Sequence, residues 1–387
     1  MNDSPAQPRN IRVLVNGLHA KSGGGVTYLR NILSHLADDE RLELHLLLHA
    51  DQLELFAPVD ERVQLRVLSF TRGFWYLMLW EQFALPRLAH AMSVDVTFSP
   101  ANYGPLFAPN PVIMLRNALS VGSEERRLAK RLYWAAVTLM TAASLVRCRR
   151  AIAVSYYARR ALSFGRQHWR ETKTDVVYHG VNPLFSPGEK TPGVEPYLLV
   201  VADIYIQKNL HTLIEALAIL HRTFPGLRLK IAGRRNDENY HGELVRLITR
   251  LGLEDSVEFL GHRREDDLLT LYRDCAVFVL PSTVETFGNP LAEAMATRVP
   301  VATSRTAAMP EIVGDGAILF DPLDAADMAG NIAKLLEDAD FARELAARGE
   351  ANVAASIISS IGVMPAIGSF ENCPSEYETA PRRRPSM

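Results

Sequence analysis

Residues 277–295 read VFVLPSTVETFGNPLAEAM and combine an apolar run, a turn and a helical pattern in one short stretch. The run Val277–Leu280 is typical of a buried strand. The turn contains Gly288, and Pro290 suits the first turn of the helix that follows. Because a helix N-terminus carries unpaired N–H groups and the positive end of the helix dipole, this stretch predicts a seat for a phosphate group.

Two carboxylates, Glu285 and Glu293, lie eight residues apart in the same stretch. The first precedes the predicted helix and the second lies about one turn inside it, so they cannot form a stacked pair on one helix face. We expect one carboxylate to reach toward the strand end and the other to accept hydrogen bonds from hydroxyl groups near the helix start. Taken alone, the spacing fits a solvated helix face equally well, and the complete string is more specific than the spacing.

Short apolar runs alternate with helical patterns on both sides of this stretch, which predicts β-α-β units and parallel sheets. The runs expected to form strands are 11–15, 44–48, 94–98, 112–115, 151–154, 176–178, 197–201, 227–232, 257–260, 276–280, 299–303 and 317–320. The predicted fold class is therefore α/β. Two doubly wound domains are expected to present the carboxyl ends of their strands to a shared cleft.

A turn-rich segment, residues 182–196, contains four prolines and two glycines and separates the two series of runs. It predicts an N-terminal domain over residues 10–185, a linker over 186–196 and a C-terminal domain over 197–350. Residues 351–387 include an uncharged, serine-containing stretch and end in an arginine cluster. We expect them to form a poorly ordered tail.

The charges are unevenly distributed, although the whole chain has a net charge of only −2. Residues 1–190 carry 23 Lys and Arg against 16 Asp and Glu, and residues 191–387 carry 19 against 28. The small net charge argues against nucleic acid as a partner, and the basic half is where an anionic partner would dock. Three scattered cysteines and a polar N-terminus without a signal-peptide pattern predict a reducing, cytoplasmic location.

Contact with a membrane surface is a further hypothesis. The uncharged stretch 132–146 is too short to span a bilayer. Residues 116–173, however, carry 13 basic and 3 acidic side chains, and the aromatic run Phe74–Tyr76 lies upstream. A basic, aromatic surface suits peripheral contact with anionic lipid at the inner face of the cell membrane. Ordinary solvated helix faces would give the same count.

The string 281–295 resembles the E-x7-E region of retaining GT-B glycosyltransferases, in particular the family 4 type, also called glycosyl transferases group 1. The resemblance extends over roughly residues 13–345. The other stretches that carry it, in chain order, are 15–28 with Gly23-Gly24-Gly25, 151–155, 176–182, 198–210 with Lys208-Asn209, 257–261 and 310–313. It implies the GT-B fold, with two Rossmann-like domains facing across a cleft.

The resemblance also implies a nucleotide-sugar donor held mainly by the C-terminal domain. Lys208 matches the lysine that contacts the donor diphosphate, and a lysine is a mobile point charge suited to phosphate. Glu293 matches the glutamate that binds the donor ribose, and Glu285 matches the glutamate near the donor sugar hydroxyls. The backbone N–H groups expected to approach sugar and phosphate are those of Phe287, Gly288 and Asn289.

Gly24 and Gly25 are expected to let the backbone of the N-terminal domain approach the diphosphate. Two positions depart from the family pattern. An arginine is often found five residues before the lysine, where this chain has Asp203, and we consider Arg234 or Arg235 as its substitute. Many relatives have a histidine where this chain has Arg116.

Arginine stays protonated, so Arg116 is not expected to act as a general base but to serve the leaving diphosphate or an anionic acceptor. His19 in the glycine loop is a spare candidate near the reacting centre. Residues from Ala351 onward do not resemble the C-terminal helix that crosses back onto the N-terminal domain in this family.

The resemblance implies hexosyl transfer, mannosyl or glucosyl, with retention at the anomeric carbon. No segment resembles an Asp-x-Asp metal site, so no metal or other cofactor is expected. The basic N-terminal half favours a lipid-linked glycan acceptor in bacterial surface polysaccharide or lipopolysaccharide synthesis, with a soluble acceptor as the alternative. Two other functions remain open, a nucleotide-sugar epimerase and a non-catalytic sugar-nucleotide-binding subunit.

Overall fold

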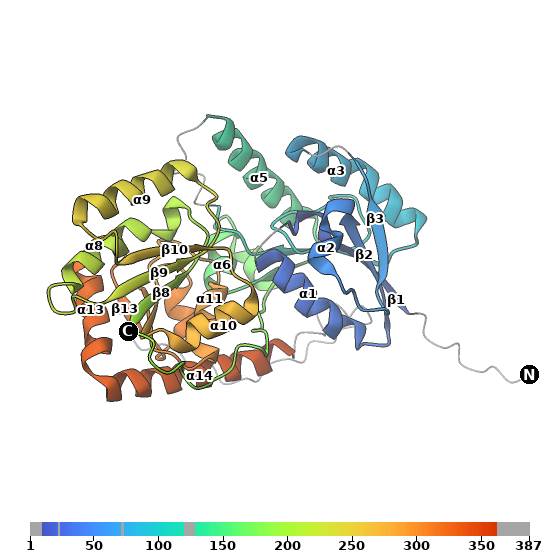
Figure 1. The fold of residues 1–387 in the computed structure, drawn as a ribbon. Helices are drawn as coiled ribbons and strands as arrows, with labels where there is room; N and C mark the ends of the chain where they lie inside the picture. Colours follow the sequence, from blue (N-terminus) through green and yellow to red (C-terminus); the bar gives the residue numbers. More distant parts are fainter. Residues whose placement is uncertain (1–9, 22–23, 71–72, 120–127, 362–387) are drawn as a thin grey trace, which may run out of the picture.

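The structure, a computed structural model, describes residues 10–21, 24–70, 73–119 and 128–361. These residues form two α/β domains that lie side by side, with the first drawn in blue to green and the second in yellow-green to red (Figure 1). Each domain is built on one parallel sheet with helices on both of its faces, the arrangement that alternating strands and helices predict.

The N-terminal sheet has seven strands in the order β3-β2-β1-β4-β5-β6-β7. Its strands are β1 (Ile11–Asn16), β2 (Leu42–His49), β3 (Gln64–Leu68), β4 (Val96–Ser99), β5 (Pro111–Leu115), β6 (Arg150–Ala153) and β7 (Thr174–Val176). Its helices are η1 (Gly17–His19), α1 (Gly24–Ala37), η2 (Ala50–Gln52), α2 (Leu53–Phe56), α3 (Phe74–Ala91), α5 (Leu128–Arg147), α6 (Tyr156–Ala161) and α7 (Gln167–Thr172).

The C-terminal sheet has six strands in the order β10-β9-β8-β11-β12-β13. Its strands are β8 (Tyr197–Val201), β9 (Arg228–Ala232), β10 (Val257–Gly261), β11 (Val277–Leu280), β12 (Val301–Ser304) and β13 (Ile318–Phe320). Its helices are η3 (Ile206–Lys208), α8 (Leu210–Leu220), α9 (Glu238–Leu251), α10 (Glu265–Asp274), α11 (Asn289–Ala296), α12 (Met309–Val313), α13 (Ala325–Glu337) and α14 (Ala339–Ile361).

The strand order reverses once in each sheet, between β1 and β4 and between β8 and β11. Loops that leave neighbouring strands at such a point turn to opposite faces of the sheet and leave a crevice at its carboxyl edge. The fold therefore offers one ligand-binding position in each domain, and the residues that follow these four strands are the first to examine.

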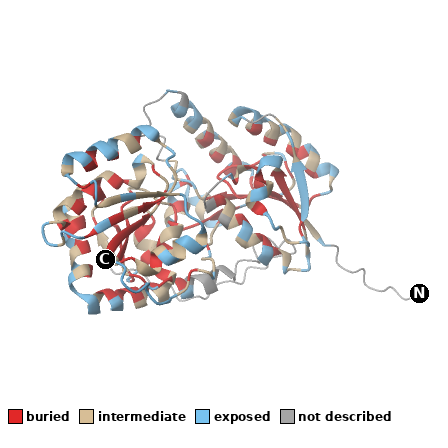
Figure 2. Cartoon of the chain, viewed as in Figure 1, coloured by how far each residue is buried: buried red, intermediate tan, exposed pale blue. Residues whose placement is uncertain are grey.

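The inner strands of both sheets are buried (Figure 2), and their alternate residues belong to separate apolar cores on the two faces. In β1, Val13 and Val15 pack on one side and Leu14 on the other. In β8, Leu199 faces one core and Leu198 the other. Val13 and Leu199 belong to the same cluster of buried apolar side chains, so one core continues from the first domain into the second.

The prediction of a poorly ordered tail from residue 351 differs from the structure over residues 351–361, which continue α14. This helix runs along the lower edge of the C-terminal domain (Figure 1). Val353 is buried beside Ile312 and Phe287, and the same small cavity is lined by Tyr178 from the end of the first domain. The burial of Val353 stabilises the helical conformation of residues 351–361, although the serines and isoleucines of this stretch have a lower intrinsic helix propensity. Residues 362–387 lie outside the described part of the chain.

Within the described ranges, we find no helix whose length and apolar character would let it cross a bilayer. The uncharged stretch 132–146 forms the middle of α5, a helix of the N-terminal domain.

We predict that Val353→Asp lowers the free energy of unfolding by about 3 kcal/mol, because it places a charge in an apolar contact. The neighbouring Ala354 is exposed on the same helix, so Ala354→Asp serves as the matched control for helix propensity. Urea unfolding followed by circular dichroism measures both variants. Equal effects of the two substitutions would contradict the packing of residues 351–361.

Candidate functional site

The reversal point of the C-terminal sheet brings Lys208 and Glu285 together. Lys208 ends η3, in the loop after β8, and Glu285 lies in the loop after β11. Lys208 Nζ is 2.5 Å from Glu285 Oε1, and the Ser282 hydroxyl donates to the same oxygen at 2.9 Å. The two side chains are 20% and 16% exposed, so the pair lies at the surface of the crevice and can be reached by a ligand.

Local backbone interactions hold the two loops in this position. Asn209 adopts a left-handed conformation with φ 53°, and its amide donates to the carbonyls of Pro281 and Pro322. The backbone N–H of Thr283 donates to the carbonyl of Gln207 at 2.9 Å, which joins the loops directly. Lys208 and Glu285 are therefore fixed by neighbours on both sides.

Helix α11 begins at Asn289, directly after the loop that carries Glu285. Gly288 caps it with φ 86°, a conformation that residues with a Cβ rarely adopt. Pro290 occupies the first turn, where no intrahelical N–H bond is lost. The strand, turn and helix predicted from residues 277–295 are thus all present, and the N–H groups at the start of α11 lie next to the Lys208–Glu285 pair in the chain.

Glu293 occupies a different environment from Glu285. It faces α10, where the hydroxyl of Tyr272 donates to Glu293 Oε2 at 2.8 Å. Burial raises the pKa of Glu293 to about 7, against the effect of the Tyr272 hydrogen bond, which lowers it. The two glutamates therefore have separate surroundings, one paired with a cation and one with a pKa near neutral pH.

Asp203 accepts hydrogen bonds from the adjacent loop. Its Oδ1 accepts from the N–H of Arg234 at 2.9 Å, and its Oδ2 accepts from the amide of Asn236 at 2.9 Å. Because Arg234 follows β9 directly beyond Gly233, Asp203 fixes the backbone of Arg234 at the same carboxyl edge as Lys208. The side chain of Arg234 is half-buried and makes no ion pair with any residue that the structure describes.

Arg116 follows β5 in the N-terminal domain and lies against the start of α1. Gly24 begins this helix, and a Cβ on Gly25 would come within 3.3 Å of Arg116 Nη1. Glycine therefore leaves room for the guanidinium. Burial lowers the pKa of Arg116, while the nearby Tyr28 raises it. The carbonyl of Arg116 accepts a hydrogen bond from the hydroxyl of Thr286, so this residue reaches the loop of Glu285.

Phe287 and Asn289 direct their side chains to the junction of the domains. His179 Nδ1 is 2.8 Å from Asn289 Oδ1, and its ring lies between those of Tyr28 and Phe287, each with its centroid 5.0 Å away. Burial, and then the charge of Arg116, lower the pKa of His179 to about 4. His179 is therefore neutral at physiological pH and belongs to the junction.

Further contacts across the junction come from residues that sequence reasoning did not select individually. The carboxylate of Glu311 accepts from the N–H groups of Tyr156 and Tyr157, at 2.6 and 2.8 Å, and from the hydroxyl of Tyr178 at 2.9 Å. Ser155 donates to the carbonyl of Thr286 at 2.6 Å. The string 310–313 had drawn attention to Glu311 only as part of a pattern. These contacts bring the carboxyl edges of the two sheets together.

The structure thus places the predicted residues in two groups. Lys208 and Glu285 are in direct contact, with Gly288 at the start of the adjoining helix. The group at the domain junction contains Gly25, Arg116, Phe287 and Asn289 together with Tyr28 and His179, which the sequence did not suggest.

Residues 183–352 match the family described as Glycosyl transferases group 1. The match covers the C-terminal domain, including the Lys208–Glu285 pair and α11. A mannosyltransferase that builds the O-antigen chain in Escherichia coli is 34% identical over 173 residues, which are 42% of this chain and 45% of that protein. The chain thus spans less than half the length of this curated relative.

Two solved structures share the whole fold. Anabaena Alr3699/HepE, in complex with UDP and glucose, has a TM-score of 0.75 at 20% identity and covers 93% of this chain and 100% of its own. WaaG, a glycosyltransferase involved in lipopolysaccharide biosynthesis, has a TM-score of 0.73 at 14% identity with the same coverage. The α/β fold of two Rossmann-like domains is therefore the GT-B fold, as the sequence predicted.

We predict that Glu293→Gln removes a pH-dependent contribution to stability. Between pH 4.5 and 7 the folded wild type holds a proton on Glu293 that the unfolded chain releases, so its stability falls as pH rises and levels off above pH 7. The variant should therefore gain about 2 to 3 kcal/mol relative to wild type between pH 5 and 8. Unfolding by urea at each pH measures the difference. A difference that stays constant with pH would show that Glu293 does not titrate in this range.

Proposed function

We propose that this protein is a retaining glycosyltransferase of the family 4 type, which moves a hexose from a nucleotide sugar to an acceptor hydroxyl. The Lys208–Glu285 contact at the reversal point of the C-terminal sheet carries this proposal. The named relatives act as mannosyltransferases or bind UDP and glucose, which supports mannose or glucose as the transferred sugar.

Lys208 and the start of α11 are proposed to hold the donor diphosphate. Lys208 Nζ lies 2.5 Å from Glu285 Oε1, so the carboxylate holds the ammonium in place at this edge of the sheet. The helix N-terminus adds N–H donors, through Gly288 and Asn289, and a positive dipole end. Groups fixed in advance around a developing negative charge are the strongest contribution that a site of this kind makes to rate.

Glu285 is assigned to the hydroxyl groups of the donor sugar and Glu293 to those of the ribose. A hydroxyl that donates to a carboxylate favours its charged form. Donor binding is therefore expected to draw the proton from Glu293. Arg234 and Arg116 supply further positive charge at the carboxyl edges of the two sheets, with Gly24 and Gly25 giving the backbone access to the diphosphate.

Retention is proposed to proceed without a protein nucleophile. Arg116 stays protonated, so it can stabilise the leaving diphosphate but cannot accept a proton. The acceptor oxygen forms the new bond to the anomeric carbon as the bond to the diphosphate breaks, and the leaving phosphate oxygen takes the acceptor proton. Orientation of the acceptor hydroxyl then supplies much of the remaining acceleration. Lys208 takes the role that a divalent metal would otherwise have, and transfer should persist in EDTA.

A lipid-linked glycan is the proposed acceptor, in the synthesis of a bacterial surface polysaccharide at the inner face of the cell membrane. Helices α3 and α5 carry a set of exposed apolar side chains, and their outer faces are pale blue in Figure 2. These side chains are Trp75, Tyr76, Leu79 and Phe83 on α3 and Leu128, Leu132, Leu139 and Val146 on α5. Exposed apolar groups near Arg131 and Arg147 suit an anionic lipid surface.

We predict that Glu285→Ala and Lys208→Ala each reduce transfer by at least a hundredfold, because each removes a group that contacts the donor. The experiment first ranks UDP-glucose and GDP-mannose by thermal shift, since a bound ligand raises apparent stability. Transfer to octyl α-D-mannopyranoside is then measured with the better donor. Glu254→Ala, at an exposed position of the same domain, is the control and should keep full activity.

Near-normal transfer by Glu285→Ala would contradict the site. Donor binding without any transfer would favour the non-catalytic subunit. Donor conversion in the absence of acceptor, with a change of configuration in the sugar, would favour the epimerase.

We also predict that Trp75→Ser, Leu79→Ser and Phe83→Ser, combined in one variant, weaken binding to vesicles that contain phosphatidylglycerol by about tenfold or more. The three side chains lie at intervals of four residues and so share one face of α3. Vesicle co-sedimentation measures the binding. Val245→Ser removes an exposed apolar side chain from α9 and should have no effect. Unchanged binding by the triple variant would exclude this face as the membrane contact.

A further inference from the structure

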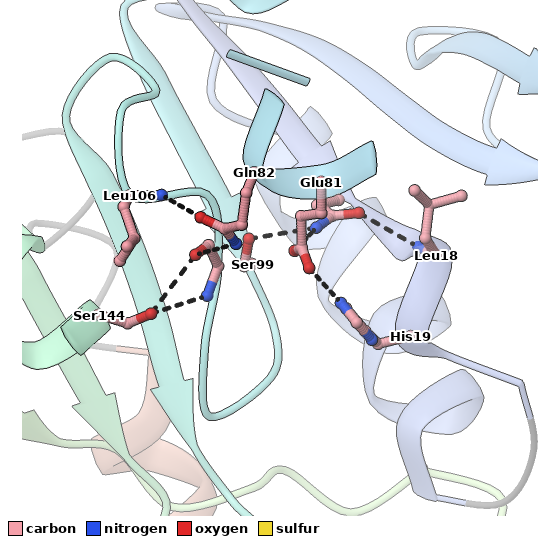
Figure 3. Close-up of polar contacts among 9 residues, drawn as sticks. Leu18, His19, Glu81, Gln82, Ser99, Leu106 and Ser144 are labelled. Atoms are coloured by element: carbon pink, nitrogen blue, oxygen red, sulfur yellow. Dashed lines mark hydrogen bonds and ion pairs between the residues drawn. The ribbon is translucent and has the colours of Figure 1, made fainter. Parts of the chain in front are cut away.

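A fully buried carboxylate lies at the reversal point of the N-terminal sheet. Glu81 projects from α3 and is 0% exposed. Its Oε1 accepts from the side-chain amide of Asn16 at 2.6 Å, and its Oε2 lies 3.0 Å from His19 Nε2 (Figure 3). Burying a carboxylate is costly unless it is paired, so the imidazole of His19 is a principal partner of this charge.

The pair lies where the fold predicts a ligand. His19 ends η1, directly after β1, and the Asn16 amide that binds Glu81 also reaches the Ser99 hydroxyl, at the end of β4, at 3.3 Å. Strands β1 and β4 flank the point where the strand order reverses. His19 thus follows the strand of the first domain that corresponds to β8, after which Lys208 lies, and Glu81 reaches the same point from α3.

The imidazole of His19 contacts Glu81 through Nε2, which leaves Nδ1 available to a ligand. Its side chain is 17% exposed, and among the described residues Nδ1 has no hydrogen-bond partner. The ring of Tyr103 contacts it edge to face, with the centroids 5.0 Å apart. A carboxylate on one ring nitrogen fixes both the tautomer and the direction of the other nitrogen, the arrangement by which imidazoles orient hydroxyl groups.

A purely structural role does not explain the His19–Glu81 pair, because other side chains already hold the neighbouring loops. The loop after β1 is already held by Gln52, whose amide donates to the carbonyls of Gly17 and Ala20 at 3.0 and 2.8 Å. The opposite wall, the loop between β4 and β5, is held by Gln82, which bonds to Gly104 and Leu106 (Figure 3). Both walls are thus fixed without a buried charge.

We propose that His19 binds the acceptor through Nδ1, at a hydroxyl group of a sugar, and that Glu81 is the positioning residue for its ring. This inference rests on the proposed transferase function. With the neutral imidazole, Nε2–H donates to Glu81 and Nδ1 accepts from the acceptor O–H. His19 directs that oxygen, and the proton stays on it until the leaving phosphate takes it.

Two substitutions separate acceptor binding from a structural role. The amide of asparagine occupies the place of Nδ1, whereas the amide of glutamine occupies the place of Nε2. His19→Asn therefore keeps a hydrogen-bonding group for the acceptor and loses the contact with Glu81, and His19→Gln does the reverse. His35→Gln, on the exposed face of α1, is the matched control.

Transfer to octyl α-D-mannopyranoside is measured with the donor selected by thermal shift, together with the Kd of that donor. We expect His19→Gln to raise the acceptor KM about tenfold and His19→Asn to raise it less, as for loss of one hydrogen bond to a polar ligand. Glu81→Gln should also raise the acceptor KM. The donor Kd should stay within twofold of wild type in all three variants.

The outcomes separate a failure of the role proposed for His19 from a failure of the proposed transferase function. A wild-type protein that neither binds a donor nor transfers sugar would overturn the proposed function and this inference with it. Wild-type transfer with an unchanged acceptor KM in His19→Gln, or with parallel losses for donor and acceptor, would overturn the role of His19 alone. A larger acceptor defect in His19→Asn than in His19→Gln would assign the pair to structure.

Discussion

Thr286 joins the two domains at the point where their ligand-binding edges meet. Its hydroxyl donates to the carbonyl of Arg116, and its own carbonyl accepts from the hydroxyl of Ser155. Because Thr286 directly follows Glu285, the position of the Glu285 carboxylate is coupled to two strand ends of the other domain. The geometry of the whole site therefore depends on these two hydrogen bonds across a protein interior, where each is electrostatically stronger than in water.

A glutamate paired with a nitrogen-bearing side chain lies at the reversal point of each sheet. In one domain Glu285 is paired with the ammonium of Lys208, and in the other Glu81 is paired with the imidazole of His19. The first pair is partly exposed and suits an anionic ligand. The second contains a fully buried carboxylate and an imidazole whose Nδ1 has no hydrogen-bond partner among the described residues, which suits a hydroxyl group. Two domains of one architecture thereby present different chemistry at equivalent points of their sheets, as the proposed transfer between two substrates would require.

The sequence predicted those features that depend on local patterns. The strand 277–280, the turn at Gly288 and the helix from Asn289 follow from an apolar run, a glycine and a proline, and the structure has all three. The proximity of Lys208 and Glu285 did not follow from spacing and came only with the family resemblance. Contacts between residues 77 positions apart depend on sheet order, which a single sequence does not display.

Three features were missed for identifiable reasons. Helix α3 has apolar residues on almost every side, so its sequence does not show which face is buried. The burial of Glu81 therefore could not be predicted. Strand β3 lies at the edge of its sheet with exposed side chains, and it lacks the apolar run that marks the inner strands. Residues 351–361 have a composition that favours irregular chain, and the burial of Val353 overrides it.

Glu311 has a consequence for how the two domains can separate. Its carboxylate caps the first turn of α6 and holds Tyr178, so a residue of one domain completes a helix of the other. A small outward rotation would lose charge-assisted bonds to two N–H groups and a hydroxyl at once. Because hydrogen bonds weaken steeply with distance and angle, the free-energy cost of separating the domains at this point falls on the first small displacement.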